Sequence, residues 1–164
     1  MATTLTVTHQ FSASPSQVYA LLTDRAFLDR RLAETGGEDP SVVSLETTGD
    51  GAVVVTRQSI PASALPSMVA SMIPGDPVTE RTETWRSNGD GYAADLAVVI
   101  KGAPASLKGT MTLDPAGTGC SLTIDGQASV PIPLFGSKIE AVVVEQVSDL
   151  IEKENQYTAA TLSS

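Results

Sequence analysis

The last quarter of the chain contains a long amphipathic run without helix breakers. From about Leu134 to Tyr157 there is no proline, and no glycine after Gly136. Apolar residues recur there at the three- and four-residue spacing of one helix face, namely Ile139, Val142, Val143, Val147, Leu150 and Ile151. A helix of about 24 residues would be roughly 36 Å long at 1.5 Å per residue. Such a helix can cross a whole small domain, so the rest of the chain must cover its apolar face.

The ends of this predicted helix are less sharply defined than its middle. Ser137 and Glu140 have the spacing of a capping box, which leaves the start open to either side of Gly136. The polar residues 158–164 follow the amphipathic run, and we expect them to form a frayed tail.

The first 37 residues predict a strand followed by two short helices. Residues 3–11 alternate between apolar and polar positions, which is the period of a strand with one buried face. Ser14, Pro15 and Gln17 then provide an N-cap, a first helical residue and a capping-box partner. A second short helix is expected from Thr23 or Asp24 to the glycine pair at 36–37.

The middle of the chain reads as three β-hairpins. Their expected arms are residues 42–47 and 52–58, 79–86 and 91–101, and 105–114 and 120–130. Antiparallel hairpins followed by a separate helix indicate an α+β fold. We therefore expect a curved antiparallel sheet of about six to seven strands wrapped around the long C-terminal helix, in a single domain spanning residues 1–164.

Residues 59–77 differ in kind from the segments on either side. They hold four prolines, and Met68 and Met72 lie among other apolar residues between them. We expect a short apolar helix flanked by helix breakers, acting as a lid or portal over a cavity because methionine repacks readily. Ordinary core cover is the alternative, and an exposed apolar side would instead suggest a protein partner or a homodimer contact.

Charge and cysteine content narrow the classes of partner. The formal net charge is −9, from 19 acidic and 10 basic residues, which disfavours nucleic acid and anionic membranes. No cysteine or histidine spacing fits a metal site, and Cys120 is the single cysteine, expected to be a buried, inert thiol. The N-terminus lacks the features of a signal peptide, and no apolar stretch is long enough to span a membrane. We expect a cytoplasmic, bacterial protein without metal or cofactor.

The order of elements resembles the START-like, or Bet v 1-like, helix-grip superfamily (also called SRPBCC), which includes polyketide cyclases and lipid-transport proteins. The sharpest local match is the segment 11–24, with its strand end, Ser-Pro turn, short helix and aspartate. Within the superfamily, residues 9–11, 83–85 and 133–140 resemble a bacterial branch catalogued as a domain of unknown function. The resemblance implies a deep hydrophobic pocket between sheet and helix, whose ligands include lipids, sterols and polyketides.

Catalytic chemistry has little support in the residues. His9 is the only histidine, so a general-base scheme through an imidazole would need it. Its strand parity places it on the expected buried face, where a lone histidine is more often a hydrogen-bonded core residue. No nucleophile elbow, His-x-Glu pair or phosphate loop is present. We assign no catalytic residue, and the role of His9 stays open.

Arg81, Glu83 and Trp85 share one face of a predicted strand. If Trp85 points inward, parity brings both charged residues toward the same interior. A buried charge needs a partner or a polar ligand group, so Arg81 and Glu83 are the best candidates for polar groups in a pocket. The alternative is an ion pair at the rim of the sheet, or an outward Trp85.

The remaining candidate ligand contacts are apolar or aromatic. Tyr19 and Tyr92 could each orient a guest by one hydrogen bond, although aromatic residues mostly pack in cores. Val143 and Val147 lie on the apolar face of the long helix. With Met68, Met72, Arg81, Glu83 and Trp85 they complete the expected ligand-binding set.

We therefore expect a non-enzymatic binding or carrier protein for a hydrophobic small molecule, such as a lipid, a sterol or a polyketide-like compound, in a cavity between sheet and helix. Two alternatives stay open. One is a cyclase or dehydratase that acts on a polyketide-like substrate, with Arg81, Glu83, His9 and a tyrosine as acid-base groups. The other is a protein-interaction module with a collapsed pocket. A continuous cavity of roughly several hundred Å³ would argue against the last.

Overall fold

The structure is a computed structural model, and it describes residues 3–59, 63, 67–71 and 75–163. Within these residues, seven antiparallel strands form one sheet in the order β1-β7-β6-β5-β4-β3-β2. The elements in chain order are β1 (Thr3–Phe11), α1 (Pro15–Leu22), α2 (Arg25–Thr35), β2 (Glu38–Thr48), β3 (Gly51–Ser59), α3 (Ser67–Ala70), β4 (Val78–Asn88), β5 (Gly91–Lys101), β6 (Ala105–Ala116), β7 (Gly119–Ser129) and α4 (Gly136–Ser163).

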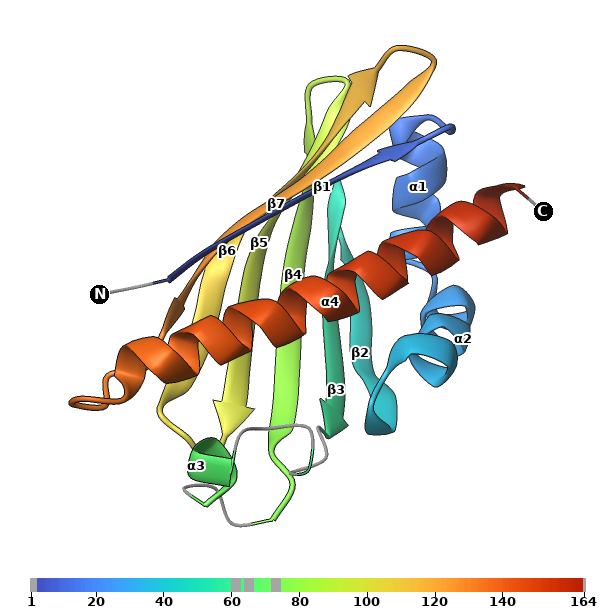
Figure 1. The fold of residues 1–164 in the computed structure, drawn as a ribbon. Coiled ribbons are helices and arrows are strands. Elements are labelled where there is room, and N and C mark those ends of the chain that lie inside the picture. The colour runs from blue at the N-terminus through green and yellow to red at the C-terminus, as the bar shows by residue number, and fades with distance from the viewer. Residues whose placement is uncertain (1–2, 60–62, 64–66, 72–74, 164) are drawn as a thin grey trace.

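The long helix lies across one face of the curved sheet, as Figure 1 shows. It packs against β1, β7 and α2, and the core fills the space between these elements. The largest fully buried side chains come mostly from the sheet and from α1 and α2; they include Trp85, Phe27, Leu5, Leu107, Leu113 and Leu122. The expected α+β fold, with a curved antiparallel sheet, a long C-terminal helix and two short helices after the first strand, is confirmed.

Local sequence chemistry sets the first two helices as expected. The Ser14 side chain accepts a hydrogen bond from Gln17 N at 3.2 Å, and Gln17 Oε1 accepts one from Ser14 N at 2.9 Å. Asp24 caps α2 by accepting from Phe27 N at 3.1 Å. Gly36 ends that helix, with its N–H donating to the Leu32 carbonyl. These caps satisfy backbone groups that the helices themselves leave unpaired.

The C-terminal helix is longer than the sequence pattern suggested. It starts at Gly136 and runs for 28 residues, so Ser137 and Glu140 lie inside it rather than at its cap. Glu140 is buried, and its two oxygens accept from Thr3 Oγ1 at 3.1 Å and from Val130 N at 3.0 Å. The expectation of a frayed tail from residue 158 is wrong, because Thr158 is completely buried and receives a hydrogen bond from Arg31 of α2.

The expected lid segment is described only in part. The four-residue helix α3 lies within it, as the sequence predicted for a short helix between breakers. The Met68 side chain and all of Met72 lie outside the described residues, so their role in a lid stays a prediction. No described helix is long and apolar enough to cross a membrane.

Candidate functional site

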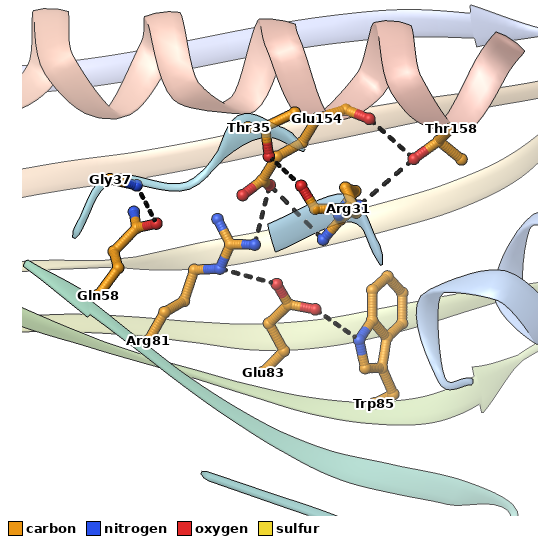
Figure 2. Close-up of polar contacts among 9 residues, drawn as sticks. All are labelled: Arg31, Thr35, Gly37, Gln58, Arg81, Glu83, Trp85, Glu154 and Thr158. Atoms are coloured by element: carbon orange, nitrogen blue, oxygen red, sulfur yellow. Dashed lines mark hydrogen bonds and ion pairs between the residues drawn. The ribbon is translucent and has the colours of Figure 1, made fainter. Parts of the chain in front are cut away.

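Four charged side chains meet in the interior between α2, β4 and α4. They are Arg31, Arg81, Glu83 and Glu154, which we call the charged cluster (Figure 2). Arg81 Nη2 donates to Glu154 Oε1 at 2.8 Å, and Arg81 Nε lies 3.1 Å from Glu83 Oε2. Arg31 Nη2 lies 3.6 Å from the same oxygen of Glu154. The side chains of Arg31, Glu83 and Glu154 are 6–8% exposed and that of Arg81 is 12% exposed, so the whole cluster is sheltered from water.

Two neutral side chains extend this cluster at opposite ends. Trp85 Nε1 donates to Glu83 Oε1 at 3.0 Å. Thr158 Oγ1 donates to the backbone carbonyl of Glu154 at 2.8 Å and accepts from Arg31 Nη1 at 3.4 Å. Figure 2 shows the resulting line of contacts from the indole of Trp85 to Thr158 of α4. It ties a central strand of the sheet to the helix that covers it.

Strand parity places the β4 members of the cluster. Trp85 is 2% exposed and Glu83 6% exposed, so Trp85 points inward and alternate residues of β4 face the interior with it. The rim alternative does not describe Arg81, whose guanidinium lies between two carboxylates inside. A rim pair does occur one position away on the other face of β4, where Glu80 contacts Arg57 at 2.6 Å and Lys101 at 3.4 Å.

The charged cluster shifts the pKa values of two of its members, Glu154 and Arg81. Burial alone would raise the pKa of Glu154, but the guanidinium groups of Arg81 and Arg31 outweigh it and hold this pKa below its ordinary value. Burial opposes the charge of Arg81 as well, yet the carboxylates of Glu154 and Glu83 raise the Arg81 pKa above its ordinary value. The carboxylate of Glu154 and the guanidinium of Arg81 are therefore both ionised at neutral pH.

Two small hollows flank the Arg81–Glu154 contact. The first hollow has a volume of about 10 Å³ and is lined by Leu22, Arg31, Arg81, Glu83, Leu96, Met111, Leu122, Ile124, Ile151, Glu154 and Asn155. The second hollow has a volume of about 40 Å³ and is lined by Leu32, Thr56, Gln58, Thr79, Arg81, Val98, Val147, Leu150 and Glu154. Arg81 and Glu154 line both, so their ion pair forms part of the wall of each hollow.

The polar wall of the first hollow includes donors without acceptors. Within the described part of the chain, Asn155 Nδ2 and Arg31 Nε are buried and have no hydrogen-bond partner. Arg81 Nε is close to Glu83 but its N–H is not aligned for a hydrogen bond. Unpaired buried donors are uncommon in folded proteins. Three of the four found among the described residues line this hollow, and the fourth, Arg57 Nε, lines neither of the two hollows.

Three of the predicted aromatic residues form a group next to the cluster. Tyr19 of α1 stacks on Tyr92 of β5, with ring centroids 3.8 Å apart and planes 2° from parallel. Tyr19 also meets Trp85 edge-on at 5.7 Å. Burial, followed by the nearby Tyr92 and Asp50, raises the pKa of the Tyr19 hydroxyl. Through Trp85 this group is joined to Glu83 and the cluster.

The other predicted residues are distributed more widely. Val147 lines the second hollow, whereas Val143 is buried in the core and lines neither of these two hollows. His9 is half-buried on β1 with its ring 4.6 Å from that of Phe11, while the cluster is built from α2, β4 and α4. Cys120 is buried, and burial raises the pKa of its thiol. No group of three or more potential metal ligands occurs among the described residues.

Three residues of the site were not predicted from the sequence, namely Arg31, Glu154 and Asn155. Glu154 lies three and four positions after Ile151 and Leu150, and Arg31 lies four after Phe27. Both charges therefore continue the apolar stripe of their own helix. A charged residue at a buried stripe position was the available signal, and it points to a partner inside the fold.

A third hollow lies on the outer face of the sheet, over β1, β6 and β7. Its volume is about 260 Å³, and it is lined by Thr4, Lys108, Gly109, Thr110, Asp125, Gly126 and Gln127. Although it is the largest of the three, the side chains around it are exposed and polar. The inner hollows, with their buried charges, are therefore the stronger candidate site.

This architecture places the chain among α+β proteins in which a seven-stranded antiparallel sheet is covered by one long C-terminal helix. Comparison with known sequences gives the family: the chain belongs to the family described as "Protein of unknown function (DUF2505)", whose model matches residues 6–162. The expectation of a family catalogued as a domain of unknown function is confirmed. The uncharacterized protein Rv0481c of Mycobacterium tuberculosis (strain ATCC 25618 / H37Rv) is 30% identical over 162 residues, covering 94% of this chain and 93% of that protein.

Solved structures share the fold at low sequence identity. The protein TTHA0849 from Thermus thermophilus matches with a TM-score of 0.63 and 18% identity, over 97% of this chain and 99% of that one. DynU16, a protein from the dynemicin biosynthetic locus, matches with a TM-score of 0.52 and 16% identity, over 98% of this chain and 47% of that one. At these identities the likeness establishes the arrangement of sheet and helix only.

Proposed function

We propose that this protein binds an apolar small molecule between the sheet and α4, in the manner implied by its resemblance to the helix-grip superfamily. The observation that supports this most directly is the pair of hollows sharing the Arg81–Glu154 contact. Leucine, isoleucine and methionine side chains form six of the eleven lining residues of the first hollow, and the other five are the polar residues Arg31, Arg81, Glu83, Glu154 and Asn155. An apolar lining with a few fixed polar groups is the usual composition of a small-molecule site.

A bound small molecule needs more space than the two hollows provide. The two hollows measure about 10 and 40 Å³, whereas small-molecule pockets occupy roughly 300–1,000 Å³. Arg81 Nε also lies 3.1 Å from Glu83 Oε2, so a guanidinium that moved away from Glu154 would still have a carboxylate beside it, and its movement would open the wall shared by the two hollows. The bound form therefore requires displacement of Arg81, of α4, or of both.

Binding fits these residues better than acid-base catalysis. Glu83 and Glu154 are both held by Arg81, and His9 lies on β1 beside Phe11 rather than in the cluster. A cyclase or dehydratase would have to free one of the carboxylates before it could move a proton.

The small volumes favour a second candidate, in which the interior stays closed and the protein acts through its surface. Leu134 is 91% exposed and Phe135 40% exposed just before α4, which gives an apolar contact point for a protein partner. This candidate predicts that no apolar probe enters the interior.

A titration with the neutral fluorescent probe N-phenyl-1-naphthylamine distinguishes the two. Val147→Phe fills the second hollow, and Glu145→Phe places the same side chain on the exposed face of α4 as a matched control. The proposal predicts saturable one-to-one binding that is lost in Val147→Phe and kept in Glu145→Phe, with cooperative unfolding in both. Absence of saturable binding to the unaltered protein would refute it and support the closed interior.

A further inference from the structure

The donors in the wall of the first hollow specify what a guest must offer. Arg31 and Asn155 are 5% and 4% exposed, and both line this hollow. Arg31 Nε and Asn155 Nδ2 have no acceptor among the described residues. A buried donor without a partner is unfavourable, because it has lost its hydrogen bond to water without replacing it. The complementary group on a guest is therefore a hydrogen-bond acceptor.

The charges of the cluster limit that acceptor to a neutral one. The two guanidinium groups of Arg31 and Arg81 balance the two carboxylates of Glu83 and Glu154. An anionic acceptor such as a fatty-acid carboxylate would add an uncompensated negative charge to a site that excludes water, and isolated buried charges are strongly unfavourable. A carbonyl oxygen accepts hydrogen bonds without disturbing this balance.

The rest of the first hollow is apolar. The side chains that complete its lining are Leu22, Leu96, Met111, Leu122, Ile124 and Ile151. A guest that matches these surroundings has its polarity concentrated at one point and a hydrocarbon or aromatic body around it.

Resting on the proposed function, we infer that the guest is a neutral apolar molecule with a carbonyl oxygen, and that Asn155 Nδ2 and Arg31 Nε donate to this oxygen. The carbonyl class covers ketones, quinones, esters and amides. The competing explanation is one ordered water held by the same donors, since a volume of about 10 Å³ is at the lower limit for a single water molecule.

Four probes with one ring system test the inference by isothermal titration calorimetry at pH 7. They are fluorene, 9-fluorenone, 9-fluorenol and fluorene-9-carboxylate, which differ only in the group at one carbon. We expect fluorenone to bind about tenfold more tightly than fluorene, as two hydrogen bonds to buried donors imply, and the carboxylate to bind more weakly than fluorenone.

Variants of Asn155 test whether the preference for fluorenone over fluorene comes from the donors that line the first hollow. Asn155→Leu removes the donor at similar volume, Asn155→Asp replaces it with an acceptor, and Asn88→Leu makes the first change at the exposed end of β4. Because Arg31 Nε remains, the preference for fluorenone over fluorene should fall from tenfold to about threefold or less in both Asn155 variants, and Asn88→Leu should keep the tenfold preference. The series on the unaltered protein decides the ligand class even where one Asn155 variant fails to fold.

The possible failures are distinct. Equal binding of fluorene and fluorenone by the unaltered protein, or an undiminished tenfold preference in Asn155→Leu, would overturn the inference and leave water as the partner of the donors, with the proposed function intact. Tighter binding of fluorenol than of fluorenone would overturn the carbonyl assignment. Failure of all four probes to bind would overturn both the inference and the proposed function.

Discussion

Replacing Glu154 by glutamine tests whether the charged cluster holds α4 to the sheet. The substitution keeps the shape of the side chain and removes only its charge. It leaves the guanidinium of Arg31, 3.6 Å away, without a carboxylate, and that of Arg81, 2.8 Å away, with only Glu83. Because these groups are almost fully shielded from water, solvent cannot replace the lost charge.

The size of the effect follows from this burial. Removing one partner of a buried ion pair costs about 3–5 kcal/mol of unfolding free energy. The amide oxygen of glutamine still accepts one hydrogen bond from Arg81, so we expect a value near the lower end, about 3 kcal/mol. For a chain of 164 residues this corresponds to a fall in melting temperature of roughly 6–12 °C.

Glu80→Gln is the matched control. Glu80 also contacts two cations, Arg57 at 2.6 Å and Lys101 at 3.4 Å, but its side chain is 25% exposed and both cations are about half exposed. Water and salt screen this group, so the loss of unfolding free energy in Glu80→Gln should be far smaller than in Glu154→Gln. Urea unfolding monitored by the single tryptophan, Trp85, measures both variants in one assay. A Glu154→Gln loss no larger than that of Glu80→Gln would refute the account of the cluster.

Three further predictions rest on other contacts. The pKa of Glu154 is lowered in the folded state from its ordinary 4.5. The ionised Glu154 therefore stabilises the fold above about pH 4.5, and this stabilisation is lost as the pH falls through the folded-state pKa. The unfolding free energy of Glu154→Gln should accordingly depend less steeply on pH below pH 4.5. Glu140→Leu leaves Val130 N–H buried without its acceptor, so it should cost about 1–3 kcal/mol and accelerate hydrogen exchange at that amide. A chain ending at Tyr157 lacks the buried Thr158 and the contact it makes with α2, and calorimetry should show a lower melting temperature.

A specific result would contradict each of these three predictions. Identical acid profiles for the unaltered protein and Glu154→Gln would mean that this carboxyl does not contribute through its ionisation. Unchanged exchange at Val130 would mean that Glu140 is not its partner in solution. A truncated chain as stable as the full one would restore the frayed tail that the polar sequence suggested.

Local patterns were sufficient to predict the fold because its elements are set by nearby residues. The caps at Ser14 and Asp24 and the glycine after α2 act within one helical turn. Strand parity placed Glu83 and Trp85 inside with Arg81, since a period of two leaves no other choice once the tryptophan is buried.

The partners in the site could not be predicted in the same way. Glu154 meets Arg31 from a distant part of the chain, and only the packing of α2 against α4 brings them together. On sequence alone, a charge on a helix is more often solvated than buried. The same packing buries Thr158, in a segment whose polar composition is typical of a frayed end.

The location of a bound guest tests the central proposal most directly. In a ¹H–¹⁵N NMR titration with 9-fluorenone, the single indole resonance of Trp85 reports on the contact with Glu83, and the side-chain amide of Asn155 reports on the first hollow. We predict that both resonances shift with the same saturable dependence on fluorenone. Shifts confined to the outer face around Lys108 and Thr110, or no shift at either interior group, would contradict a binding site between the sheet and α4.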